Sequence, residues 1–166
     1  MTLLARRPTR TFAQAPEGLF AACCVDVQNL GLVQGAYGPK HKVRLVWQLD
    51  LTTEEGRRYE VARVYTLSLH ERAALRKDLE SWRGRAFTEK ELDGFDLERL
   101  LTVNCQIQVV QRLGDDGTVY ANVATVIPPA KGHMKLAPID FVRLKDRQPH
   151  QSNGATREVT VDDIPF

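Results

Sequence analysis

Residues 59–84 read YEVARVYTLSLHERAALRKDLESWRG, and this stretch decides the fold. Its first part, 59–67, is rich in Val, Tyr and Thr and predicts a β-strand. Ser68, followed three residues later by Glu71, has the spacing of a capping box and predicts the start of a helix. Apolar residues then recur at helical spacing at Leu75, Leu79 and Trp82 before Gly84 ends the pattern. A strand therefore leads directly into the strongest helix of the chain.

Two further strands are expected before this stretch. Residues 19–27 (LFAACCVDV) form a nearly continuous apolar run, and the glycines and the proline that follow predict a loop over 28–40. A second strand over 42–49 alternates in character. Its apolar face carries Val43, Leu45, Trp47 and Leu49, and its basic face carries Lys42, Arg44, Val46 and Gln48.

The chain after the helix predicts a short helical piece and a hairpin. Thr88 with Glu91 has capping-box spacing, and a turn is expected over 96–101. Strands over 103–113 and 118–127 flank Asp116-Gly117, a strong hairpin signal, and two prolines end the second strand. The inward side of the first of these strands is Cys105, Ile107 and Val109, and the outward side of the hairpin is Gln106, Gln108, Arg112, Tyr120 and Asn122.

Three strands, a helix and two strands predict an all-β fold with one main helix. The order matches a five-stranded Greek-key barrel of the OB type, with the helix between strands three and four. On the third strand the small apolar residues Ala62, Val64 and Thr66 suit the inside of a narrow barrel. We therefore expect Arg63 and Tyr65 on the same strand to face outward.

The chain divides into three parts by composition. Residues 1–16 form a basic arm with Arg6, Arg7 and Arg10, which we expect to be flexible, and 17–147 form the domain with a basic C-terminal extension. Apolar residues at 139–144 could lay part of this extension back on the barrel. Residues 148–166 are polar, predict a disordered tail and end in the acidic tip Asp162-Asp163-Ile164-Pro165-Phe166.

Length and composition favour one soluble domain. The chain of 166 residues has 43% apolar and 27% charged residues and no run near the roughly 18 apolar residues of a membrane helix. No secretory signal is recognisable, and three cysteines without CxxC spacing favour a reducing cytoplasm. Residues 149–166 hold one Arg and three acidic residues, so the rest of the chain keeps 22 basic and 18 acidic residues, a net +4. A basic body with an acidic tail favours a domain that binds a polyanion.

The sequence contains no complete catalytic or metal-binding motif. His70-Glu71 begins like a zinc-protease HExxH motif, but Ala74 stands at the second ligand position. No phosphate-loop motif occurs, the four histidines and three cysteines have no zinc-like spacing, and a hairpin turn explains Asp115-Asp116. We therefore expect neither an enzyme nor a metal or other cofactor.

With catalysis disfavoured, we expect a binding function. Single-stranded nucleic acid offers a charged backbone and unstacked bases, which basic and aromatic side chains can bind. The candidates on the first hairpin and the third strand are Tyr37, Lys40, Lys42, Arg44, Arg63 and Tyr65. Trp47 could belong to the core or to the binding groove. Arg83 and Arg85 after the helix could contact phosphate or cap helix carbonyls, and Arg112 with Tyr120 could line the groove from the last hairpin.

Two parts of the chain resemble known families. The tip at 162–166 resembles the terminal tip of bacterial single-stranded DNA-binding proteins, which docks onto replication and repair enzymes. The segments 66–71 (TLSLHE), 79–85 (LESWRGR), 95–97 (FDL) and 120–123 (YANV), with the Pro128-Pro129 exit, resemble phage-encoded single-stranded DNA-binding proteins over roughly 17–131. This resemblance implies an OB-fold and sequence-tolerant binding of single strands in phage replication or recombination in the bacterial host cytoplasm.

We therefore expect a protein that coats and protects single-stranded DNA and recruits replication and repair proteins through its tip. A protein–protein adaptor, in which the tip adds avidity, and a nuclease-associated subunit are the alternatives. Outward Lys, Arg and Tyr favour nucleic acid over the adaptor, and the missing carboxylate cluster disfavours the nuclease. The preference for DNA over RNA, the site size and the oligomeric state stay open, and a homo-oligomer is compatible with the sequence.

Overall fold

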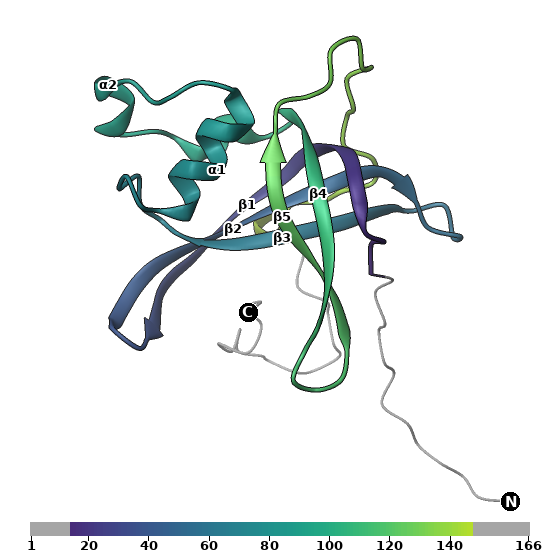
Figure 1. Ribbon diagram of the computed structural model, residues 1–166, viewed down its shortest axis with the longest axis horizontal. Coiled ribbons are helices and arrows are strands. Elements are labelled where there is room, and N and C mark those ends of the chain that lie inside the picture. Colours follow the sequence, from purple (N-terminus) through teal and green to yellow (C-terminus); the bar gives the residue numbers. More distant parts are fainter. Residues whose placement is uncertain (1–13, 148–166) are drawn as a thin grey trace, which may run out of the picture.

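The computed structural model describes residues 14–147, which form a mostly-β structure with helices beside one end of the sheet (Figure 1). Five antiparallel strands make one sheet in the order β3-β2-β1-β4-β5. The strands are β1 (Gly18–Gly35), β2 (Gly38–Thr52), β3 (Arg58–Thr66), β4 (Asn104–Leu113) and β5 (Val119–Ile127). The helices are α1 (Ala74–Arg83), α2 (Glu89–Leu92) and the 3₁₀ turns η1 (Leu97–Leu100) and η2 (Leu144–Asp146). The predicted order of three strands, a helix and two strands is confirmed.

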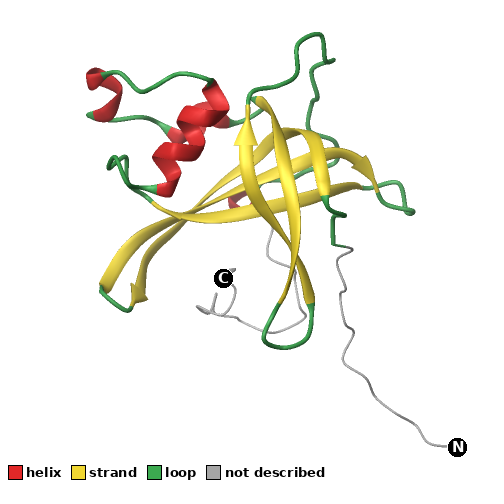
Figure 2. Ribbon diagram, in the orientation of Figure 1, coloured by secondary structure: helices red, strands yellow, loops and turns green. Residues whose placement is uncertain are grey.

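The sheet does not close into the predicted barrel. β3 and β5 are its two edge strands, and the pairing among the described residues joins each to one neighbour only. The β4–β5 hairpin crosses steeply over β3 and β2 (Figure 2), and a guanidinium nitrogen of Arg63 reaches the carbonyl of Val123 on β5 at 3.5 Å. The two edges therefore approach each other without forming a ladder.

The first hairpin is much longer than the sequence pattern predicts. The expected loop over 28–40 is wrong, because β1 continues to Gly35 and turns into β2 through Ala36 and Tyr37. A register shift between Asn29 and Gly31 absorbs an extra residue, with Gly31 at φ 68° and its N–H donating to Asn29 Oδ1 at 2.9 Å. A glycine bulge bends a strand without ending it, which is why the glycine did not mark a loop.

Helix α1 begins later than the capping-box pattern predicts. Ser68 Oγ instead accepts the N–H of His70, and His70 Nδ1 accepts the N–H of Arg72, so local side-chain bonds hold a turn where the helix was expected. The predicted stop is confirmed, since Gly84 adopts the left-handed conformation at φ 72°. The capping box of Thr88 with Glu91 is also confirmed.

Tryptophan and tyrosine side chains occupy the centre of the core. Trp47 is fully buried and lies 6.0 Å from Trp82, centroid to centroid, so Trp47 belongs to the core and not to a groove. The expected outward position of Tyr65 is wrong, because only 2% of this residue is exposed. The predicted inward side of β3 is correspondingly inverted, with Val61 and Tyr65 buried and Val64 exposed. Helix α1 covers this face of β3. The buried residues of the helix share one core with the large β3 side chains that the alternation pattern had predicted to face outward.

Residues 136–144, here called the strap, return to β1 and β2. Gln48 exchanges two hydrogen bonds with the backbone of Ile139, at 2.8 and 2.9 Å, and Arg143 forms an ion pair with the buried Asp26 at 3.0 Å. The extension lies back on the sheet as expected, but polar contacts hold it, because the apolar Ile139 and Val142 are about half exposed. Val46 and Gln48, which were expected on an exposed basic face, are buried.

Candidate nucleic-acid interface

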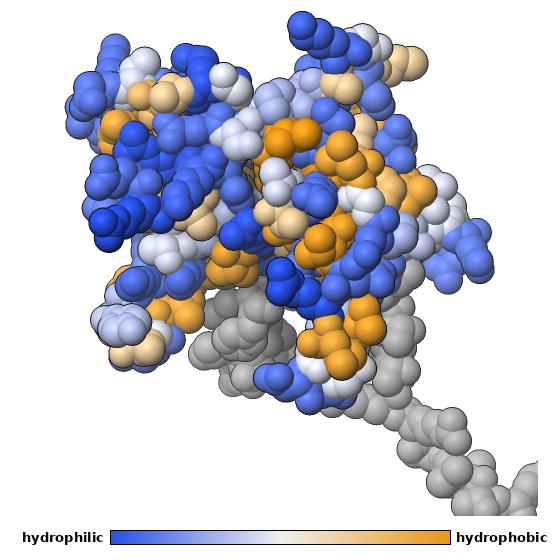
Figure 3. Space-filling view, in the orientation of Figure 1, coloured by the Kyte–Doolittle hydropathy of each residue, from blue (hydrophilic) through white to orange (hydrophobic). Residues whose placement is uncertain are grey.

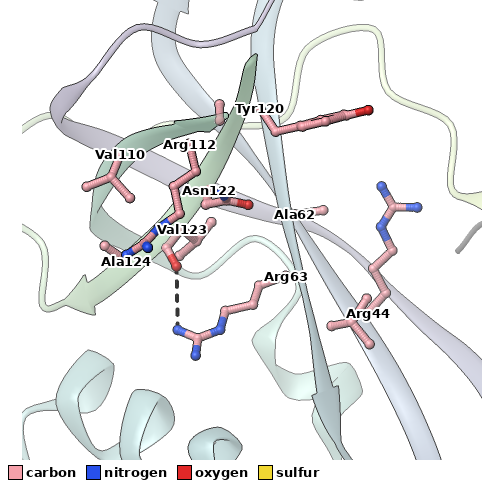
Figure 4. Close-up of a pocket in the computed structure, with 11 residues that line it drawn as sticks. Arg44, Ala62, Arg63, Val110, Arg112, Tyr120, Asn122, Val123 and Ala124 are labelled. Carbon is pink, nitrogen blue, oxygen red and sulfur yellow. Dashed lines mark hydrogen bonds between the residues drawn. The ribbon is translucent and has the colours of Figure 1, made fainter. Parts of the chain in front are cut away.

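A groove of about 660 Å³ lies where β3 and β5 approach each other (Figure 4). We call it the β3–β5 groove. Four strands contribute to its lining, and none of the lining side chains is acidic. The lining residues are Arg44, Ala62, Arg63, Val64, Val110, Arg112, Tyr120, Ala121, Asn122, Val123 and Ala124.

Three arginines supply the charge of the groove. Arg44 on β2 and Arg112 on β4 form no ion pair within residues 14–147. Arg63 on β3 is held at 3.0 Å by Asp78 of helix α1 and lies 5.1 Å above the ring of Tyr65. Two of the three charges are thus available to an anion, and the third is partly balanced from behind.

The Asp78 carboxylate of helix α1 holds the Arg63 side chain in position. One of its oxygens accepts both the Arg63 guanidinium and the Tyr65 hydroxyl, the latter at 2.6 Å. Burial, followed by the hydrogen bond to Asp78, raises the pKa of Tyr65 above its ordinary value. Tyr65 therefore orients the groove arginine from the core instead of offering its ring to a ligand.

Tyr120 is the aromatic side chain of the groove wall. It is 42% exposed, and its hydroxyl donates to Asp116 in the hairpin turn at 2.7 Å. This bond raises the pKa of Tyr120 and lowers that of Asp116. A Cβ atom at Gly114 would lie 2.6 Å from the ring, so the absence of a side chain there lets the ring rest against the turn. Tyr120 is therefore held at its hydroxyl end, while a large part of the residue stays exposed.

The predicted DNA-binding residues on the surface of the sheet fall into two groups. Arg44, Arg63, Arg112 and Tyr120 meet in the groove (Figure 4). Tyr37, Lys40 and Lys42 line a smaller depression of about 200 Å³ at the end of the β1–β2 hairpin. Tyr37 is almost fully exposed, and the Lys42 ammonium donates to Thr66 at 2.7 Å. Lys42 precedes Arg44 by two residues, so the two side chains lie on the same face of β2.

Arg83 and Arg85 do not line the groove. Arg83 pairs with Glu91 at 2.7 Å and stacks on the ring of Phe87 at 4.7 Å, so it ties α1 to the following helix. Arg85 is exposed in the loop after α1. Neither side chain donates a hydrogen bond to a carbonyl of α1 within residues 14–147, so the expected capping contact is not observed either.

Sequence reasoning missed Asp78 and Gly114. Asp78 stands between two buried leucines of the helix, and its partner Arg63 is 15 residues away, so no spacing rule links them. Gly114 was overlooked because the hairpin turn signal Asp116-Gly117 lies shortly after it and needs only the glycine at 117. The tip residues Asp162, Asp163, Ile164, Pro165 and Phe166 lie outside the described residues.

Neither a protein-family model nor a curated protein matches the chain. Within residues 14–147, no helix is long and apolar enough to cross a membrane. The same part of the chain contains no group of three His, Cys, Asp or Glu side chains that could hold a metal ion.

Proposed function

We propose that this protein binds single-stranded DNA in the β3–β5 groove. The observation that carries the proposal is a groove lined by three arginines and an exposed tyrosine, without a lining carboxylate. Backbone phosphates would pair with the arginine side chains, and an unstacked base would lie on the Tyr120 ring. Apolar side chains, in orange, gather over the β4–β5 hairpin (Figure 3). The apolar lining from β3 and β5 would contact sugars and base edges.

The strand arrangement supports an OB-type assignment. The order β3-β2-β1-β4-β5 with a helix between β3 and β4 has the connectivity of a five-stranded Greek-key barrel opened between β3 and β5. Barrels of that type are partly open and bind oligonucleotides across one face. The β3–β5 groove lies at this opening, which is why we favour the binding of single-stranded DNA over a role as a protein–protein adaptor.

The test is a fluorescence-anisotropy titration of labelled oligo-dT at several salt concentrations. Each phosphate contact on a single strand contributes a slope of about −0.7 in log K against log salt. Arg44→Ala with Arg112→Ala should therefore flatten the slope by about 1.4. A control with Arg57→Ala and Lys131→Ala removes the same charge at exposed positions outside the groove. Equal effects of the two variants, or duplex DNA that competes as well as single strands, would contradict the proposal.

We also propose that the tip at 162–166 recruits replication or repair proteins. The support is sequence chemistry, since two carboxylates, an isoleucine and a phenylalanine suit a basic pocket with an apolar floor. Full-length protein, a variant lacking 162–166 and Phe166→Ala are compared as bait in nuclease-treated bacterial lysate. Replication enzymes should be captured by the full-length protein alone, and their capture by all three proteins would refute this role.

A further inference from the structure

Asn122 is a polar residue of the β3–β5 groove whose side chain has no partner among the described residues. It lies on β5, is exposed and lines the groove. Figure 4 shows its amide between Arg112 and Tyr120, with no hydrogen bond to the residues drawn. On the adjacent strand β4, in contrast, the amides of Asn104 and Gln106 donate to backbone carbonyls of the chain after β5. The Asn122 amide is therefore available to a ligand in the groove.

Asn122 gives the groove a hydrogen-bond acceptor beside a donor. A side-chain amide carries a carbonyl oxygen that accepts and an NH₂ group that donates. The other lining side chains do not offer this pair, since those of arginine only donate, the Tyr120 hydroxyl is bonded to Asp116, and the rest are apolar. The arginines suit phosphates, whereas the amide suits a ligand group that presents an acceptor and a donor side by side.

The position of Asn122 brings its amide next to a base bound at Tyr120. The two residues are two positions apart on β5, so they share one side of the strand about 6.8 Å apart. Across the strand pair, Tyr120 lies opposite Arg112, and Asn122 lies opposite Val110. The separation along β5 is comparable with the width of a base. A base that lies on the Tyr120 ring can therefore turn its hydrogen-bonding edge toward the amide.

The Watson–Crick edge of every DNA base is complementary to a side-chain amide. Adenine and cytosine present an amino donor beside a ring-nitrogen acceptor, whereas guanine and thymine present a carbonyl acceptor beside a ring N–H donor. An amide meets either order, because a half-turn about its last rotatable bond exchanges its oxygen and its NH₂ group. These edges are free in a single strand and are occupied by base pairing in a duplex. An amide in this position therefore distinguishes unpaired from paired bases without distinguishing one base from another.

We propose that the Asn122 amide bonds to the free Watson–Crick edge of the base at Tyr120 and thereby favours single-stranded over duplex DNA. The inference rests on the proposed function and adds to it the residue that recognises an unpaired base. The groove arginines do not supply this preference, because phosphate contacts carry no information about the bases and a duplex offers phosphates as well.

The experiment measures fluorescence anisotropy for wild type, Asn122→Ala and the control Gln108→Ala. Gln108 is an exposed amide on β4 outside the groove. The probes are oligo-dT, oligo-dC, duplex DNA and an oligo-dT made of N3-methylthymine, in which the methyl group blocks the ring N–H donor and leaves the ring able to stack.

Asn122→Ala should weaken binding to oligo-dT and oligo-dC by on the order of tenfold, the net value of one or two neutral hydrogen bonds. Methylation should weaken wild-type binding by a similar factor and leave Asn122→Ala unaffected. Duplex binding and the slope of log K against log salt should stay those of wild type, because the amide is uncharged. Gln108→Ala should bind every probe as wild type does.

The outcomes separate this inference from the proposed function. Wild type that binds methylated and unmethylated oligo-dT equally overturns the inference alone, as does Asn122→Ala that keeps wild-type affinity for both single strands. Methylation that weakens Asn122→Ala as much as wild type also overturns it, because another group then contacts the base edge. A loss on oligo-dT without a loss on oligo-dC overturns the base-independent contact. Wild type that binds no single strand, or binds duplex DNA as tightly, overturns the proposed function and the inference with it.

Discussion

Replacing Arg143 by Met should be among the most damaging single changes to the stability of the domain. Asp26, with 1% of its surface exposed, accepts hydrogen bonds from Val27 N–H, Gln28 Nε2, Arg143 Nε and Leu144 N–H at 2.9 to 3.1 Å. Methionine keeps much of the apolar volume of arginine but removes its positive charge. The substitution therefore leaves a buried carboxylate without its counterion and loosens the strap from β1.

The expected loss follows from this burial. Removing one partner of a buried ion pair costs about 3–5 kcal/mol, because the remaining charge is uncompensated. The second partner of Arg143, Glu98, is half exposed and contributes at most about 1 kcal/mol. For a domain of this size, a loss of 3–5 kcal/mol corresponds to a fall in Tm of roughly 10–20 °C.

The loss should depend on pH. Burial raises the pKa of Asp26, but hydrogen bonds from Leu144, Gln28 and Arg143 outweigh it, so the pKa lies below its ordinary value. A depressed pKa stabilises the folded state above the unfolded value of about 3.9, and this stabilisation is lost as pH falls through the folded pKa. Without Arg143 the pKa of Asp26 rises, and protonation near pH 4 relieves the buried charge. The gap between wild type and variant should therefore be largest at pH 7 and shrink toward pH 4.

Urea unfolding followed by circular dichroism at pH 7 and pH 4 measures both effects. Arg99→Met is the matched control, since Arg99 is exposed on η1 and makes no ion pair within the described residues. Glu98→Gln should cost at most about 1 kcal/mol. A loss below about 1 kcal/mol for Arg143→Met at pH 7 would show that the strap detaches without unfolding the sheet. An equal loss at both pH values would refute the role of the Asp26 charge.

Three further outcomes are expected. Tyr65→Ala should destabilise the domain by about 3–5 kcal/mol in thermal unfolding, because its ring is buried in the core, and a Tm near that of wild type would contradict this position. Tyr120→Ala should weaken oligo-dT binding by about 1–3 kcal/mol, the loss of one stacked base, whereas Tyr120→Phe should bind nearly as wild type. Gly114→Ala should also weaken this binding, because the added Cβ displaces the Tyr120 ring. Burial raises the pKa of Cys24 to about 12, so the thiols should react with a disulfide reagent only after denaturation, and rapid native labelling at pH 8 would refute their burial.

Local chemistry made a large part of the fold predictable. The alternation of Cys105, Ile107 and Val109 identified the inward side of β4, and all three are buried. Gly84 ended the helix, and Asp116-Gly117 formed the last turn, because each signal depends on a few neighbouring residues. Alternation along the strands likewise identified Arg44, Arg112 and Tyr120 as outward-facing residues, and in the folded structure all three line the β3–β5 groove.

The sequence by itself determined the number, type and order of the main elements, because periodicity and turn residues act over short distances. Only the tertiary structure decided which side of β3 meets the helix, since alternation separates two faces without telling which one is covered. Burial of Tyr65, the contact of Arg63 with Asp78 and the seating of Arg143 on Asp26 all join residues far apart in the chain. Such contacts depend on how the sheet coils and where the strap returns, and no local spacing encodes either.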